Sequence, residues 1–194
     1  AVSIEKLDNG NYLLGVHIAD VSYYVKEGAP LDNEALERGT SVYLVDRVIP
    51  MLPHKLSNGI CSLNPNVERC AVSCIMKIDN RGKVIDYDIF PSIIKSNKKM
   101  TYTSVNHYLM DNIVDEGYEE YTGALSTMKE LADIIRKERT RRGASDFDIE
   151  EPYIVCDEKG KAIDVVKRER GDGERLIEDF MIAANETIAK YFIS

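Results

Sequence analysis

The stretch VSIEKLDNGNYLLGVHIADVSYYV (residues 2–25) decides the fold class. Apolar and polar residues alternate over residues 2–7 and again over residues 12–25, as they do in half-buried strands. Between these runs lies Asp-Asn-Gly-Asn (residues 8–11), a strong signal for the turn of a β-hairpin. The stretch therefore predicts two antiparallel strands joined by a tight turn.

One acidic side chain interrupts the second of these strands. With a period of two, Asp20 falls on the same face as Leu14, Val16 and Ile18. A buried charge is unfavourable unless it is paired, hydrogen-bonded or bound to a metal. Two plainer explanations stay open: the strand emerges into solvent at Asp20, or the carboxylate binds nearby backbone amides. His17 lies on the opposite face, where a structural role is the simpler interpretation.

The rest of the chain shows further strand, turn and helix signals. We expect helices over residues 31–43, with Asp32 as N-cap, and over 103–110, 121–141 and 173–192. We expect strands over residues 70–78 and 84–96 and a hairpin over 153–169. Three prolines in residues 48–65 indicate an irregular connection with short helical turns. This order predicts an α+β fold in which antiparallel β-hairpins pack with helices.

Composition narrows the class of protein further. The chain has 194 residues, 44% of them hydrophobic, which is typical of a globular domain. No run approaches about 18 consecutive apolar residues, so we expect no membrane contact. The net charge of −8 argues against a general nucleic-acid binder, although a metal-dependent nuclease site needs clustered carboxylates. None of the four cysteines has metal-ligand spacing, and we interpret them as core residues of a cytoplasmic protein.

The helix expected over residues 173–192 carries a second pair of misplaced polar groups. On a helical projection Glu178 and Asn185 point the same way, within an arc that contains Met181, Ala184 and Phe192. Asp179 falls on a separate polar stripe. A Glu and an Asn on a buried face need partners, so they either form a hydrogen-bond network in the core or face a ligand.

The longest informative segment, residues 15–65, closely resembles the catalytic domain of the ribonuclease II and ribonuclease R family, the RNB-type 3′-to-5′ exoribonucleases. The segments RRGASDFDIEEPYIV (residues 141–155) and ERLIEDFMIAAN (residues 174–185) are similar to two further parts of that domain. VSYYV and RGTSVY look more like ribonuclease R than ribonuclease II. The resemblance runs over essentially the whole chain, in the expected order.

The resemblance implies a processive enzyme that degrades single-stranded RNA to nucleoside 5′-monophosphates. Tyr43 matches the tyrosine that stacks at the 3′ end of the RNA, and Phe147 the aromatic at the other end of the base clamp. Tyr102 and Glu178 match residues that hold the terminal nucleotide and read its ribose, and Asn185 falls near them. Stacking tolerates any base, and a carboxylate can bind the 2′-hydroxyl. Without the resemblance, the aromatic residues would be read as ordinary core side chains.

The family's metal site implies Mg²⁺ as cofactor, held by an aspartate cluster that ends in an Asp-Asp pair directly before an Ala and an apolar residue. Here Ala1 and Val2 stand at that place. We therefore expect a partial RNB domain over residues 1–194 that lacks the aspartate cluster, the catalytic arginine segment and the flanking RNA-binding domains. The chain supplies no principal metal ligand in this interpretation, Asp20 has a supporting catalytic role, and the isolated chain is inactive.

Two other functions and one association remain open. The chain could belong to a non-catalytic RNA-binding relative, which an intact aspartate cluster upstream would exclude. Alternatively, Asp20 and Glu178 could form the acid–base pair of a small-molecule enzyme, which predicts that they face each other across a closed pocket. Apolar surface exposed by missing flanks would favour dimerisation of the fragment.

Overall fold

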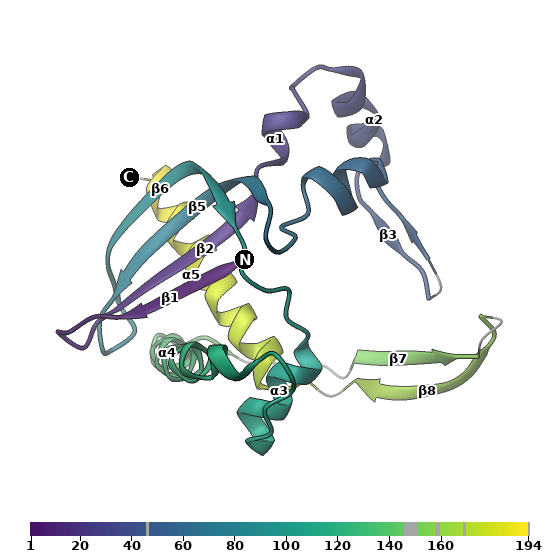
Figure 1. Cartoon of the computed structure of the whole chain (residues 1–194). Helices are drawn as coiled ribbons and strands as arrows, with labels where there is room; N and C mark the ends of the chain where they lie inside the picture. Colours follow the sequence, from purple (N-terminus) through teal and green to yellow (C-terminus); the bar gives the residue numbers. More distant parts are fainter. Residues whose placement is uncertain (46, 146–150, 158–159, 169, 194) are drawn as a thin grey trace.

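The main body of the molecule is an antiparallel sheet with helices on one face (Figure 1). The computed structural model describes residues 1–194 except 46, 146–150, 158–159, 169 and 194. The four strands stand in the order β1-β2-β5-β6, with the bounds β1 Val2–Lys6, β2 Tyr12–Ala19, β5 Glu68–Ile78 and β6 Val84–Lys95. The predicted opening hairpin is confirmed, because Val2 to Lys6 pair with Val16 to Tyr12. Pro91 lies in the edge strand β6, where its missing N–H breaks no ladder bond.

Three helices accompany the sheet. They are α3 (Tyr102–Asp111), α4 (Thr122–Arg141, preceded by the short 3₁₀ turn η2, Glu119–Tyr121) and α5 (Asp172–Ile193). A separate two-stranded hairpin, β7 (Glu151–Cys156) and β8 (Ala162–Arg168), projects beside them (Figure 1). The α+β prediction is therefore confirmed. In the described part of the chain, none of the helices is sufficiently long and apolar to span a bilayer.

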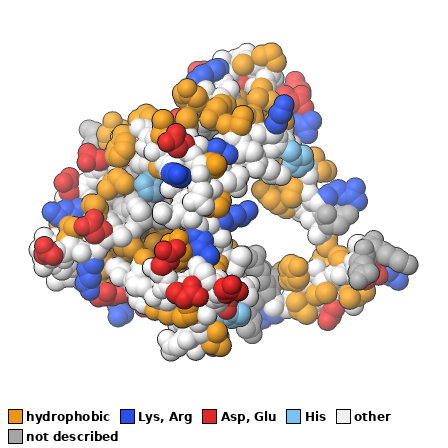
Figure 2. Space-filling view, in the orientation of Figure 1, with side chains coloured by type: hydrophobic (Ala, Val, Ile, Leu, Met, Phe, Trp, Pro, Cys, Tyr) orange, Lys and Arg blue, Asp and Glu red, His pale blue; other side chains and the backbone are white. Residues whose placement is uncertain are grey.

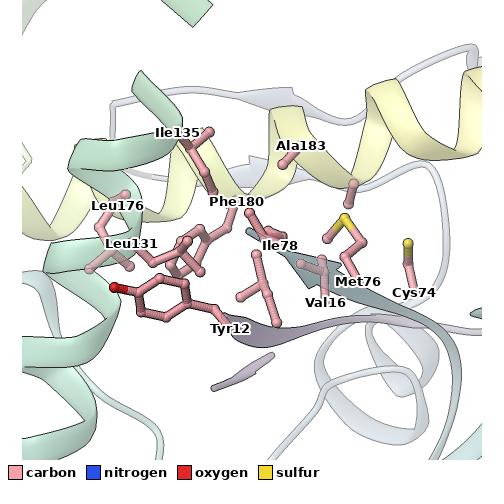
Figure 3. Close-up of a cluster of buried hydrophobic side chains, with 13 residues drawn as sticks. Tyr12, Val16, Cys74, Met76, Ile78, Leu131, Ile135, Leu176, Phe180 and Ala183 are labelled. Carbon is pink, nitrogen blue, oxygen red and sulfur yellow. The ribbon is translucent and has the colours of Figure 1, made fainter. Parts of the chain in front are cut away.

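The core lies between the sheet and the two long helices, as Figure 3 shows. Tyr12, Met76 and Ile78 point from the sheet toward α5, and Phe180 lies at the centre without exposed surface. Leu131 of α4 closes the cluster on the other side. One face of β2 and β5 is thus buried, as their period-two pattern predicts.

A row of polar side chains crosses the opposite face of the sheet. His17 Nδ1 lies 2.7 Å from Ser73 Oγ, which lies 2.6 Å from Ser92 Oγ. His17 Nε2 lies 3.2 Å from Ser3 Oγ, and a Cβ on Gly15 would stand only 2.4 Å from that Oγ. Burial and the nearby positive amino terminus lower the pKa of His17, which favours the neutral ring. His17 therefore joins strands, in agreement with the predicted structural role.

Residues 20–67 form an arm inserted between the adjacent strands β2 and β5 (Figure 1). The arm contains α1 (Val21–Tyr24), α2 (Pro30–Arg38), β3 (Val42–Tyr43), β4 (Val48–Ile49) and the π-helical turn η1 (Lys55–Ile60). Among its described residues, Ala35 is the one that is buried. The arm is therefore held by its own turns and by its two ends rather than by a core.

Two predictions about this arm are wrong. The strand expected over residues 12–25 ends at Ala19, because Asp20 caps α1. The helix expected over residues 31–43 begins at Pro30 and ends at Arg38, since Gly39 adopts a left-handed φ of 72°. Asp32 lies inside the first turn of that helix and is not its N-cap. Its carboxylate instead accepts a hydrogen bond from the Gly28 N–H (2.9 Å).

The face of α5 that packs on the core also differs from the predicted arc. The buried residues include Phe180, Ala183 and Asp179, whereas Met181, Asn185 and Phe192 are exposed. Apolar residues occur on nearly every side of this helix, so periodicity alone does not select the buried side. The buried side of α5 is the side that packs against the sheet.

Asp179 is buried because two arginines of α4 neutralise it. Arg136 donates to Asp179 Oδ2 at 3.0 and 2.6 Å, and Arg139 donates to Oδ1 at 2.8 Å. Burial raises the pKa of the Asp179 carboxyl, and the two guanidinium groups oppose that shift. The ion pairs join α4 to α5 next to the apolar core.

Candidate nucleic-acid interface

Tyr43 is a strongly exposed member of the predicted site. It ends β3, which pairs with β4 through Val42–Ile49 and Tyr43–Val48. The side chain keeps 78% of its surface exposed, and its neighbour Leu44 is also exposed. A large aromatic ring without a packing role suits stacking on a base. The alternative interpretation of Tyr43 as a core aromatic is therefore wrong.

The arm and the β7–β8 hairpin face each other across an open space, which Figure 2 shows beside the main body. Figure 1 places β3 on one side of this space and β7 on the other. Both hairpins present exposed apolar residues, among them Tyr43 and Tyr153. Phe147, the other predicted clamp residue, lies outside the described residues. The two projecting hairpins thus provide an accessible surface on which an extended polymer could lie.

Tyr102 and Glu178 lie on α3 and α5, two helices that pack against each other. Tyr102 follows the N-cap Thr101 and starts α3, and its residue is 44% exposed. Its ring lies against the start of α5: a Cβ on Gly173 would stand 3.5 Å from Tyr102 Cδ1. Glu178 follows on the same helix, about 7–8 Å further along its axis. Both residues therefore belong to the packed pair α3 and α5, whereas Tyr43 lies on the arm; a joint site of Tyr102 and Glu178 stays a prediction.

A polar network fixes this junction. Asn106 of α3 accepts the Gly173 N–H (2.7 Å) through Oδ1 and donates through Nδ2 to Glu174 Oε2 (2.9 Å). The same Glu174 oxygen accepts the Gly171 N–H (3.1 Å). A Cβ on Gly171 would stand 2.3 Å from the Asn106 amide, so any larger residue there would displace that side chain from its hydrogen bonds. The first turn of α5 is thereby held rigidly on α3.

Glu178 does not lie in the core. Its side chain is 41% exposed and forms an ion pair with Arg170, which is 32% exposed. Asn185 lies two turns further along α5 and is also exposed. A hydrogen-bond network in the core is therefore wrong for this pair, and the ligand-facing role of Asn185 stays a prediction. Periodicity gave no signal for Arg170, which precedes the helix.

Asp20 has a local structural role. Its Oδ1 accepts the Tyr23 N–H (3.1 Å) and the Ser22 hydroxyl (2.6 Å), so it caps α1. This geometry matches the open alternative in which the carboxylate binds nearby backbone amides. The supporting catalytic role of Asp20 stays a prediction. Asp20 and Glu178 have different hydrogen-bond partners. The structure therefore gives no support to an acid–base pair formed by these two residues.

The described residues do not assemble a metal centre. Over the described residues, no group of three or more His, Cys, Asp or Glu side chains could hold a metal ion. The residues present therefore do not fit a Mg²⁺ site by themselves. A hollow of about 230 Å³ lies in the arm, between α2 and the segment after β4. Its lining comprises Glu34, Arg38 and residues 50–54, and none of the predicted site residues.

Comparison with known proteins gives a consistent result. The RNB domain family model matches residues 1–194. Ribonuclease R of Thermotoga maritima is 54% identical over 193 residues, which cover 99% of this chain and 27% of that protein. The structure of Mycoplasma genitalium RNase R with double-stranded RNA has a TM-score of 0.94 at 34% identity, over 99% of this chain and 34% of that one.

A second structure of the Mycoplasma genitalium enzyme, in complex with ribose-methylated single-stranded RNA, has a TM-score of 0.93 at 34% identity, over 99% of this chain and 30% of that one. The chain spans about a quarter of the length of the curated relatives it matches. The family match, the relatives and the fold agree over almost every residue. The chain therefore belongs to the RNB domain family of ribonuclease II and ribonuclease R.

Proposed function

We propose that this chain is the nucleotide-holding part of a processive, hydrolytic 3′-to-5′ exoribonuclease that degrades single-stranded RNA to nucleoside 5′-monophosphates. The observation that carries the proposal is the exposed ring of Tyr43 on an arm of an RNB domain, together with Tyr102 and Glu178 at the α3–α5 junction. Tyr43 stacks on the base at the 3′ end, and Tyr102 and Glu178 hold the terminal ribose.

The charge of the chain and the positions of its carboxylates suggest which functions other parts of the longer protein supply. With 33 acidic and 25 basic residues, the chain gains little affinity from phosphate neutralisation. We therefore assign most of the RNA affinity to basic modules outside residues 1–194. The described carboxylates form no group that could hold a metal ion, which supports the proposal that other parts of the longer protein supply the Mg²⁺ ligands. When bound, Mg²⁺ would supply an activated water and stabilise the leaving oxygen.

Binding of RNA by the chain tests the role of Tyr43. Replacing Tyr43 by Ala is expected to raise the dissociation constant for a 5′-labelled oligo(A) RNA by about 5- to 100-fold, because the lost base stacking contributes ~1–3 kcal/mol. Fluorescence anisotropy at low salt measures it. Tyr23→Ala is the matched control, since Tyr23 is another exposed tyrosine of the arm. Equal binding by both variants and the unchanged chain would exclude the stacking role.

Turnover by the chain tests the assignment of the metal ligands. We expect no mononucleotide when residues 1–194 are incubated with labelled poly(A) and Mg²⁺, because the described residues assemble no metal-binding group. Thin-layer chromatography of the products measures release, and a full-length ribonuclease R serves as positive control. Sustained release of nucleoside 5′-monophosphate by the chain would show that the ligands lie within it.

A further inference from the structure

Arg170 lies directly before α5, between the end of β8 and the first turn of the helix. Its Nη2 contacts Glu178 Oε2 and forms an ion pair with that carboxylate. Both side chains are partly exposed, at 32% and 41%. An ion pair so close to water adds little to the stability of the fold. The contact therefore calls for an explanation other than stability.

The backbone beside Arg170 is held in place by the junction network. Gly171, the next residue, donates to Glu174 Oε2 (3.1 Å), and Glu174 in turn accepts from Asn106 of α3 (2.9 Å). The helix that carries Glu178 is bound to α3 through the same network, and α3 carries Tyr102. Arg170, Glu178 and Tyr102 are therefore attached to one rigid frame.

The two carboxylate oxygens of Glu178 have different partners. Oε2 is occupied by the guanidinium group, whereas the described residues provide no hydrogen-bond partner for Oε1. A carboxylate is an acceptor only, and a ribose 2′-hydroxyl is a donor that deoxyribose lacks. The single contact from Nη2 restrains the carboxylate at Oε2 through a charge-assisted hydrogen bond. Oε1 takes no part in this contact with Arg170 and is left for an incoming hydroxyl.

We propose that Arg170 is a positioning residue for ribose recognition: it orients Glu178 so that its second oxygen accepts the 2′-hydroxyl of the bound nucleotide. The inference rests on the proposed function, in which Glu178 faces the terminal ribose. Arg170 itself need not touch the RNA. Its loss therefore lowers the preference for a ribose end and leaves the stacking contribution of Tyr43 unchanged.

Two oligo(A) probes that differ in one atom test the role of Arg170. One RNA carries a ribose at its 3′-terminal nucleotide and the other a 2′-deoxyribose there. We expect the unchanged chain to bind the first about tenfold more tightly, because the hydroxyl donates to a charged acceptor. Arg170→Gln should bring the ratio of the two dissociation constants close to one. Arg175→Gln removes an exposed arginine of α5, the helix that carries Glu178, and should leave the ratio of the two dissociation constants unchanged.

A double variant separates positioning from a direct contact. If Arg170 acts through Glu178, the ratio in Arg170→Gln/Glu178→Gln should equal that in Glu178→Gln alone. The inference is overturned if Arg170→Gln keeps the tenfold ratio, or if the unchanged chain binds both probes equally. Failure of the proposed function looks different: Tyr43→Ala then binds both probes as tightly as the unchanged chain does. Circular dichroism of each variant verifies that the fold is retained.

Discussion

Replacing Asp179 by Ala should lower the free energy of unfolding by about 3–5 kcal/mol. The carboxylate is 3% exposed and is the shared partner of Arg136 and Arg139. Its removal leaves two guanidinium groups, 29% and 18% exposed, without their buried acceptor. Removing one member of a buried ion pair is costly because the remaining charge stays desolvated. Urea denaturation followed by far-ultraviolet circular dichroism measures the loss.

Glu186→Gln is the matched control for this prediction. Glu186 also lies on α5 and pairs with an arginine near the end of α4, Arg142, but the two side chains are 37% and 45% exposed. A pair in this setting contributes less than about 1 kcal/mol. If the two variants lose the same stability, burial does not determine the strength of the helix–helix ion pairs.

Replacing Phe180 by Ala should have an effect of similar size through a different cause. Phe180 is fully buried at the centre of the core, in contact with both the sheet and α4 (Figure 3). Truncation of a buried phenylalanine removes apolar contacts and leaves a cavity, which together lower the stability by about 3–5 kcal/mol. In a chain of this length the thermal midpoint should fall by roughly 10 °C. Differential scanning calorimetry measures the midpoint.

Phe192→Ala provides the comparison on the same helix. Phe192 is 78% exposed, so its truncation should change the stability by no more than about 0.5 kcal/mol. The helical projection placed Phe192, and not Phe180, on the buried arc. The two variants therefore also decide between the predicted and the observed orientation of α5. A large loss for Phe192→Ala with a small one for Phe180→Ala would support the predicted arc.

Strong local signals predicted most of the elements. The Asp-Asn-Gly-Asn turn, the alternation of β5 and β6 and the helical spacing in residues 121–141 gave the right element types near the right bounds. Each of these signals combines a turn or a cap with a long periodic run. Such combinations constrain the chain without reference to distant residues.

Two of the errors arise from local caps that interrupt a periodic pattern, and the others arise where distant residues decide. Alternation continues through Asp20 by chance, but its carboxylate forms a stronger local structure by capping α1. The end of α2 depends on Gly39, whose left-handed conformation stops the helix at Arg38. The buried face of α5 depends on which side the sheet covers. Asp179 could be buried because α4 supplies Arg136 and Arg139, a pairing across about 40 residues of sequence.

The site was predicted from the family resemblance and not from residue patterns. Tyr43 and Tyr102 are unremarkable in composition and spacing, and helical spacing singled out Glu178 only as a polar residue that needs a partner. The ion pair of Glu178 with Arg170 joins a helix to the loop before it, which no periodicity reveals. Asn106 likewise gave no signal in the sequence, because its side chain comes to lie beside Gly171 only when α3 packs against α5.

The arm leaves the main sheet after Ala19 and rejoins it at β5, where the Asp20 N–H donates to Cys70 O (3.0 Å). Few apolar contacts would be lost if the arm opened, because Ala35 alone among its described residues is buried. Its local unfolding should therefore require far less free energy than that of the sheet. Tyr43 could then move with an advancing strand of nucleic acid from one step to the next, while Tyr102 and Glu178 stay fixed on helices that the core holds in place.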